Sequence, residues 1–310
     1  MMDGGFLAAS TLRAHDVDTV FTLSGGHLFP LYDGCVKTDI RLVDTRHEQT
    51  AAFAAEGWAK VTRQVGVAAL TAGPGVTNGV SAITSAFFNG SPVCVIGGRA
   101  PHARWGVGSL QELDHIPIVA SVTKHAATLA TADDIPGGLD AALRGACSPH
   151  RGPTFVDIPL DGWGPSDAAV PAAPDPSTLR GPAPDGDAVA GIARMAGAAG
   201  RPVLMVGSDV YWAGAEVEVL TFAEALGIPV FANDMGRGVV PADHPLAFAR
   251  ARGTAFSGAD LVMVAGTPLD FRLGFGSFDA PVVHLADSPA GVATHVELAA
   301  SVGGDLRSTF

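Results

Sequence analysis

The first half of the chain alternates short apolar runs with longer amphipathic segments. The apolar runs are bounded by glycine or proline and occur at residues 19–23, 40–43, 65–71, 92–97 and 154–158. Most of the segments between them have the length and the single apolar face of a helix, which is typical of parallel strands joined by helices. The pattern predicts an α/β fold with a doubly wound, mainly parallel sheet.

The second half repeats this pattern on a smaller scale. Apolar runs at residues 202–206, 228–232, 260–265 and 282–286 predict strands, and residues 213–226 predict a helix. Residues 166–187, between the halves, are rich in alanine, proline, serine and aspartate, and proline cannot continue a helix. We therefore predict a first domain over residues 1–165, a surface linker over 166–187 and a second doubly wound, Rossmann-like domain over 188–310.

Composition and charge narrow the choice of partners and compartment. The chain is 47% hydrophobic and 16% charged, which suits parallel sheets covered on both faces. The net charge of −12, with no basic run, argues against nucleic acid and anionic membrane as partners. Cys35, Cys94 and Cys147 lie far apart and predict neither disulfides nor a zinc site. An acidic N-terminus without a long apolar stretch predicts a cytoplasmic protein.

Residues that could carry chemistry follow the predicted strands of the first half. In an open parallel sheet, ligands bind outside the carboxyl ends of the strands, where the loops converge. Thr77 or Asn78 is expected to cap the helix that runs through residues 80–88. The four loops predicted to face one crevice are Ser24-Gly25-Gly26-His27, Thr45-Arg46-His47-Glu48, Gly73-Pro74-Gly75 and Gly97-Gly98-Arg99.

Three segments of the first half form a recognisable combination. A glutamate at a helix start is favoured by the helix dipole without any function, and many helices follow a glycine turn for structural reasons alone. The combination is more specific, because R-H-E-Q-T-A-A-F-A-A-E-G at 46–57 is followed by T-A-G-P-G-V-T-N at 71–78 and G-S-L-Q-E-L-D at 108–114. It resembles the pyrimidine-binding domain of thiamine-diphosphate enzymes, in the branch with acetolactate synthase, oxalyl-CoA decarboxylase and 2-hydroxyacyl-CoA lyase.

The resemblance implies a role for each matching residue. The glutamate matching Glu48 hydrogen-bonds the aminopyrimidine of thiamine diphosphate and favours the imino form that deprotonates C2. Gln111 would point at the thiazolium and the reacting carbonyl, and His27 at the substrate, although a histidine after two glycines is as often a packed loop residue. His47 would orient the helix start, and His102, His115 and His125 form no metal-spaced group. The implied cofactor-binding residues are Ser24, Gly25, Gly26, Glu48, Gly73, Pro74 and Asn78.

The family also holds the cofactor diphosphate through Mg²⁺ in a third domain, on a Gly-Asp-Gly segment with a downstream asparagine. The nearest strings, at residues 184–187 and 303–305, have no room for such a site. The resemblance thus implies that Mg²⁺ and the diphosphate are held by a separate C-terminal diphosphate-binding subunit, unless the sequence is a fragment or a truncated gene product. It also implies homodimerisation of the pyrimidine-binding domains.

The second domain resembles the central domain of these enzymes. In relatives this domain binds FAD, the ADP part of coenzyme A, or nothing, and the chain lacks the dinucleotide pattern G-x-G-x-x-G. The run D-F-R-L-G-F-G at 270–276 is closer to the 2-hydroxyacyl-CoA lyases. We therefore expect part of a thiamine-diphosphate-dependent lyase or carboligase that acts on 2-hydroxyacyl-CoA or 2-keto acid substrates. The alternative is a non-catalytic nucleotide-binding or regulatory relative.

Overall fold

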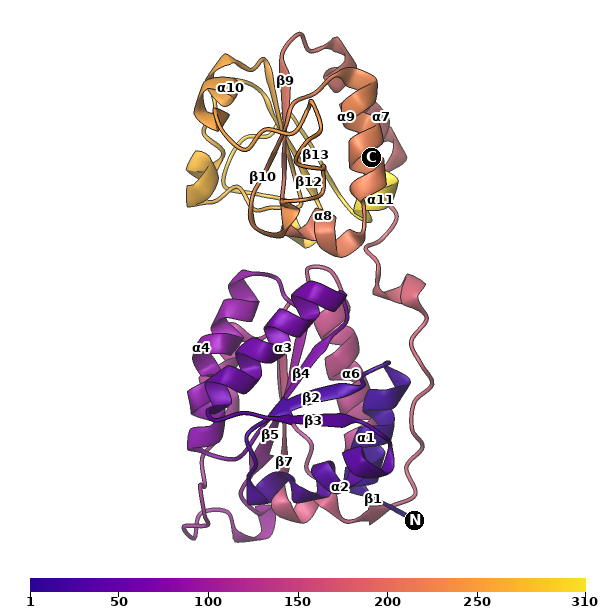
Figure 1. The fold of residues 1–310 in the computed structure, drawn as a ribbon, viewed down its shortest axis with the longest axis vertical. Helices are drawn as coiled ribbons and strands as arrows, with labels where there is room; N and C mark the ends of the chain where they lie inside the picture. The colour runs from indigo at the N-terminus through magenta and orange to yellow at the C-terminus, as the bar shows by residue number, and fades with distance from the viewer. The chain divides into compact units, whose positions relative to one another are not determined.

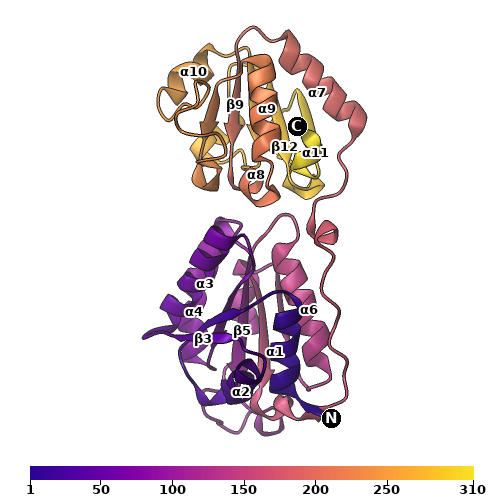
Figure 2. The ribbon, with the colours of Figure 1, turned by 45° about the vertical axis from the view of Figure 1, so that its right-hand side comes forward.

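The computed structural model describes residues 1–310, and the chain divides into two compact units, Met1–Leu179 and Arg180–Phe310 (Figure 1). Each unit contains one parallel sheet with helices packed on both faces (Figure 2). This confirms the predicted α/β class with two doubly wound sheets. None of the helices is both long and apolar enough to cross a membrane.

The sheet of the first unit has six parallel strands in the order β3-β2-β4-β5-β7-β6. All five predicted strands are present. The sixth, at the edge, was missed because its sequence, His-Ala-Ala-Thr, has no continuous apolar run. The strands are β2 (Thr19–Thr22), β3 (Arg41–Asp44), β4 (Gly66–Leu70), β5 (Val93–Arg99), β6 (His125–Thr128) and β7 (Thr154–Pro159).

Helices cover both faces of this sheet. One face packs against α1 (Gly4–Ala14), α2 (Phe29–Lys37) and α6 (Asp134–Cys147), and the other against α3 (Glu48–Thr62), α4 (Pro74–Phe88) and α5 (Ile116–Val119) (Figure 1). Side chains alternate between the two cores along each strand, as strand geometry requires. In β4, Val67 and Ala69 enter the first core, whereas Ala68 and Leu70 enter the second.

Short elements complete the first unit. β1 (Met2–Asp3) pairs antiparallel with β8 (Pro165–Ser166), which joins the first residues of the chain to the end of the unit. Single-turn 3₁₀ helices lie in the connections: η1 (Gly26–Leu28), η2 (His102–Arg104), η3 (Ala120–Val122), η4 (Leu160–Trp163) and η5 (Pro176–Leu179).

The second unit has five parallel strands in the order β10-β9-β11-β12-β13. They are β9 (Pro202–Val206), β10 (Val230–Ala232), β11 (Leu261–Ala265), β12 (Val282–Ala286) and β13 (Ala300–Gly303), the last of which the sequence pattern missed. One core contains side chains of α7 (Gly186–Ala198), α8 (Ser208–Ala213), α9 (Glu216–Leu226) and α11 (Leu306–Thr309). The other contains side chains of α10 (Arg252–Gly258) and the 3₁₀ segment η7 (Phe271–Gly276).

One predicted helix of the second unit begins later than expected. The prediction placed it over residues 213–226, but the structure has α8 ending at Ala213 and α9 beginning at Glu216. Gly214 lies between them with φ 68°, and its backbone N–H donates to carbonyl groups of α8. A glycine in this left-handed conformation ends a helix at little steric cost, so α8 stops at Ala213 and the separate helix α9 covers most of the predicted range.

Candidate functional site at the edge of the first sheet

The candidate residues gather where the strand order of the first sheet reverses. β2 lies between β3 and β4, and crevices at such reversals are where ligands bind in doubly wound sheets. Thr71, directly after β4, contacts residues from several of these loops. Its Oγ1 lies 3.3 Å from His27 Nδ1, and Cβ atoms added at Gly25 or Gly75 would lie within 2.6 Å of its side chain. Neither glycine therefore has room for a larger residue.

Glu48 is the first residue of α3 and is 9% exposed. The helix start is fixed by His47, whose side chain accepts a hydrogen bond from the backbone N–H of Gln49 at 3.1 Å. Glu48 Oε2 accepts a hydrogen bond from Asn78 Nδ2 at 3.0 Å. A Cβ atom added at Gly75 would lie 3.6 Å from Oε1. One carboxylate oxygen is thus held by α4, while the other faces a glycine.

The start of α4 differs from the prediction. The helix begins at Pro74, so Thr77 and Asn78 lie inside it and do not cap it. Gly73 occupies the N-cap position with φ 58° and ψ −117°, a conformation that an L side chain rarely adopts, and proline is preferred at the next position. Because the helix starts earlier, Asn78 projects from its second turn and reaches Glu48.

Gln111 lies beside this turn. It is half-buried, and a Cβ atom added at Gly73 would lie 3.0 Å from Gln111 Cβ. Gln111 itself has φ 56°, an uncommon value for a residue with a side chain. Glu112 stabilises the loop before it by accepting hydrogen bonds from the backbone N–H groups of Gly106 and Ser109. The structure therefore brings Gln111 and Gly73 into contact, although they are far apart in the sequence.

His27 is a buried residue of η1. It is 4% exposed in this chain, and a Cβ atom added at Gly98 would lie 2.5 Å from its Cβ. Desolvation by burial lowers the pKa of His27, which a hydrogen bond to the backbone of Leu110 partly offsets and the nearby His115 reinforces. A neutral imidazole is the expected form at neutral pH.

The remaining predicted residues line the loop edges. Ser24 and Gly26 are exposed, and no atom lies within 4 Å of a Cβ added at Gly26. Pro74 is also exposed, as expected at the first turn of α4. The fourth predicted loop, residues 97–99, is instead the end of β5, because its ladder with β7 extends to Arg99.

A buried polar network beneath the site was not predicted. His115 and Asp157 are completely buried, and their side chains are joined by a 2.9 Å contact between Nδ1 and Oδ2. Arg99 donates to the same oxygen at 2.9 Å, and Thr128 donates to Oδ1 at 2.6 Å. His115 Nε2 accepts the backbone N–H of Gly73 at 2.9 Å. The sequence does place His115 only four residues after Gln111. A search for histidines at metal-ligand spacing does not detect this proximity to a candidate site residue.

The second unit has its own cavity at the carboxyl ends of β9 and β10. Its volume is about 430 Å³, within the usual range for small-molecule sites. The lining includes Phe231, Phe248 and the arginines Arg237 and Arg252, so aromatic and cationic groups meet there. Part of this lining comes from the basic segment 247–254.

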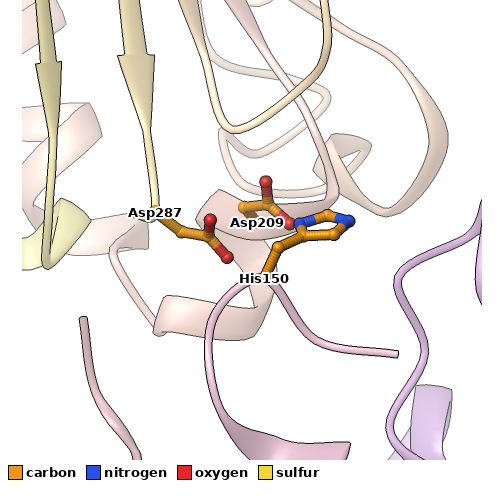
Figure 3. A group of neighbouring side chains, drawn as sticks. All are labelled: His150, Asp209 and Asp287. Carbon is orange, nitrogen blue, oxygen red and sulfur yellow. The ribbon is translucent and has the colours of Figure 1, made fainter. Parts of the chain in front are cut away.

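Two carboxylates mark another part of the same sheet edge. Asp209 belongs to the first turn of α8, and Asp287 follows β12. Both are buried, and carboxylate oxygens of the two lie within 4.8 Å of each other (Figure 3). The third labelled side chain, His150, belongs to the first unit.

Comparison with known proteins agrees with the division into two units. Residues 2–118 match the family model described as thiamine pyrophosphate enzyme, N-terminal TPP binding domain, and residues 189–310 match thiamine pyrophosphate enzyme, central domain. The chain is 52% identical over 314 residues to the acetolactate synthase large subunit of Mycobacterium tuberculosis, covering 100% of this chain and 57% of that protein.

More distant relatives carry two different names. The chain is 36% identical over 308 residues to 2-hydroxyacyl-CoA lyase 2 of Caenorhabditis elegans, covering 88% of this chain and 48% of the relative. It is 31% identical to a probable acetolactate synthase large subunit of Methanocaldococcus jannaschii, covering 55% of that protein. The chain thus spans about half the length of these relatives. On these matches and this fold, the chain belongs to the thiamine-diphosphate-dependent enzymes and contains their N-terminal and central domains.

Proposed function

We propose that the chain is the cofactor-activating portion of a thiamine-diphosphate-dependent lyase or carboligase acting on 2-hydroxyacyl-CoA or 2-keto acid substrates. The observation that carries the proposal is the environment of Glu48, a buried carboxyl at a helix start with one oxygen held by Asn78 and the other facing Gly75. The names of the relatives, acetolactate synthase and 2-hydroxyacyl-CoA lyase, support both substrate classes.

The residues present fit an aminopyrimidine ring. Glu48 Oε1 makes no hydrogen bond within the chain and can hold or share a proton with a ring nitrogen. Gly73, Gly75 and Gly25 keep the surrounding backbone free of side chains. When bound, the cofactor supplies stabilisation of a carbanion next to a carbonyl carbon. Gln111, beside Gly73, is the proposed contact to the reacting carbonyl. His27 is proposed to be a neutral group at the buried end of the loop formed by residues 24–27, on the substrate side.

The cofactor diphosphate and its Mg²⁺ are proposed to bind a C-terminal diphosphate-binding domain on a partner chain. The 57% coverage of the Mycobacterium tuberculosis relative supports a requirement for further sequence. Purification of the tagged chain from its own cells, in buffers with thiamine diphosphate and Mg²⁺, tests this by intact-mass analysis. A stoichiometric second chain with the metal-binding segment supports the proposal, whereas a single longer chain containing this sequence contradicts it.

Glu48→Gln tests the catalytic assignment. The amide cannot give or take a proton as a carboxyl does, so exchange of the C2 proton of thiamine diphosphate, followed by NMR, should fall at least about a hundredfold. The measurement uses the assembled enzyme, and the far-ultraviolet circular dichroism of the variant should match the wild type. Wild-type exchange rates in Glu48→Gln would reject the assignment and favour the alternative of a nucleotide-binding or regulatory relative.

We also propose that the first unit forms a homodimer through α3 and α4. Both helices expose large apolar side chains, among them Val61 on α3, 83% exposed, and Phe88 on α4, 76% exposed. Exposed apolar groups on adjacent helices are typical of protein interfaces. Sedimentation equilibrium of wild type and Phe88→Asp tests this, with Phe271→Asp in the second unit as the matched control.

A nucleotide is a second proposed ligand, at the cavity of the second unit. Phe248 offers an aromatic surface for an adenine or flavin ring, and Arg237 and Arg252 offer positive charge for a phosphate. Calorimetric titrations with ADP, coenzyme A and FAD, repeated on Arg237→Ala, distinguish the candidates. Binding of none of the three would identify the second unit as a scaffold.

A further inference from the structure

His115 connects the sheet of the first unit to the start of α4. Its ring is completely buried between the backbone N–H of Gly73, 2.9 Å from Nε2, and the carboxylate of Asp157, 2.9 Å from Nδ1. The ring also meets Phe155 edge to face, with centroids 6.1 Å apart. His115 therefore contacts β7 on one side and Gly73, the N-cap of α4, on the other.

The two hydrogen bonds specify which ring nitrogen carries the proton. The backbone N–H of Gly73 can only donate, so Nε2 must be unprotonated in order to accept it. The proton then lies on Nδ1, where it is donated to Asp157. Arg99 and Thr128 donate hydrogen bonds to Asp157 as well. A proton added to Nε2 would point at the N–H of Gly73, and the two donors would repel each other.

Gly73 transmits this contact to the candidate site. It is the N-cap of α4, and the second turn of α4 carries Asn78, which donates to Glu48 Oε2 at 3.0 Å. Gly73 also packs against Gln111, the other proposed catalytic side chain of this edge. A shift of the Gly73 turn would move Asn78 away from Glu48 and open the contact with Gln111.

We propose that His115 is a positioning residue whose neutral imidazole, held by Asp157 and Arg99, fixes the Gly73 turn and thereby sets Asn78 against Glu48 and Gln111 beside the turn. The identity of Glu48 and Gln111 as site residues rests on the proposed function. The coupling between His115 and Gly73 does not depend on the proposed function, and it can be measured on the chain without a cofactor.

Charged and titratable groups face His115 from several elements. Asp157 comes from β7, Arg99 from the end of β5, and His27 from η1 is close enough for electrostatic interaction. Asp114, next to His115 in the chain, binds the same Arg99 at 3.2 Å. Arg99 thus donates to both Asp114 and Asp157, and Asp157 also contacts His115 Nδ1.

Two substitutions distinguish a positioning role of His115 from a contribution of its ring to packing alone. His115→Phe keeps the ring volume but removes the acceptor for Gly73, whereas His115→Gln retains an acceptor on a flexible side chain. His284→Phe is the matched control, because His284 is also buried and accepts a backbone N–H, that of Ala293, in the second unit. All three variants should lose stability, so stability alone does not decide.

The deciding measurements are NMR experiments on the full 310-residue chain. The ring ¹⁵N shifts of wild-type His115 at pH 7 should show a protonated Nδ1 and an unprotonated Nε2. Amide exchange of Gly73 should be at least about tenfold faster in His115→Phe, recovered to within about threefold in His115→Gln, and unchanged in His284→Phe. Protonation of Nε2 in the wild type, or equal Gly73 exchange in all variants, would overturn the proposal. His115→Gln and the wild-type shifts give an answer even if His115→Phe does not fold.

A cofactor measurement on the assembled enzyme completes the test. Exchange of the thiamine diphosphate C2 proton should be at least about tenfold slower in His115→Phe than in His115→Gln. Equal rates would overturn the link from His115 to Glu48, even with Gly73 coupled as expected. No exchange in the wild type would instead reject the proposed function, while the shifts and the Gly73 amide still report on the turn.

Discussion

At the residue scale, the side chain of Asn78 orients the carboxyl group of Glu48. It is an exposed residue of α4, yet its amide donates to Glu48, which lies 30 positions earlier at the start of α3. A typical hydrogen bond within a protein contributes about 0.5–1.5 kcal/mol. The contact therefore fixes the carboxyl of Glu48 in one orientation and leaves the second oxygen for a ligand.

Removing this donor should impair the site and spare the fold. In Asn78→Ala, Glu48 loses its partner and becomes mobile, so C2 proton exchange in the assembled enzyme should fall about tenfold or more. Thr77→Ala, at the exposed neighbouring position, is the control and should leave the rate unchanged. If both variants exchange at the wild-type rate, the orientation of Glu48 does not depend on Asn78.

At the scale of elements, a second glutamate joins α3 to α4. Glu56 is 4% exposed, forms an ion pair with Lys60 at 2.7 Å, and accepts hydrogen bonds from Ser85, Asn89 and Ser91 at 2.8–3.2 Å. Desolvation by burial opposes ionisation, but these interactions outweigh it and lower the pKa of Glu56. The middle of α3 is therefore joined to the C-terminal end of α4 by hydrogen bonds to the Glu56 carboxylate.

Glu56→Gln should lower the free energy of unfolding by about 2–4 kcal/mol at pH 7, since Lys60 would lose its buried partner. Because the folded-state pKa is lowered, the carboxylate stabilises the protein above its ordinary value of 4.5, and this contribution disappears as the pH falls through the lower folded-state value. Urea unfolding should thus show a gap between wild type and variant that closes below pH 4.5. Glu224→Gln, at a half-exposed ion pair with His244, is the control and should change little at any pH. A gap that widens in acid would contradict the argument.

The whole molecule consists of two units with separate cores. The cores of the first unit contain only residues before 180, and those of the second only residues after it. Arg180 begins the second unit, is exposed, and is the single lysine or arginine within residues 166–187. Immediately beyond it, the chain is tied to the second unit by a hydrogen bond from the backbone N–H of Asp305 to Pro182.

Limited trypsin digestion should therefore cleave first after Arg180 and release two fragments that remain folded, since each retains its own sheet and cores. Mass spectrometry identifies the cut, and circular dichroism melting of the separated fragments checks their structure. Arg180→Gln should slow this first cleavage severalfold or more without changing the melting of the whole chain. Initial cleavage inside either sheet would contradict the division into two independently folded units.

Local patterns in the sequence predicted most of the elements, because apolar runs and glycine boundaries report directly on strands buried on both faces. In the two parallel sheets, the missed strands β6 and β13 lie at sheet edges, where partial exposure removes the apolar signal. The boundary errors at Gly214 and Gly73 have one cause. A glycine with positive φ ends or begins a helix within an otherwise uniform pattern, and the conformation that a glycine adopts is set by its surroundings.

The sequence by itself determined the fold class, the family resemblance and the candidate glutamate, since strand periodicity and the three motifs are properties of consecutive residues. Only the tertiary structure decided which side chains meet. Asn78 reaches Glu48 because α4 starts at Pro74, and His115 reaches Gly73 because β5 and β7 bring Arg99 and Asp157 beneath it. Such contacts join residues tens of positions apart, and their geometry follows from strand order and helix starts that no local pattern encodes.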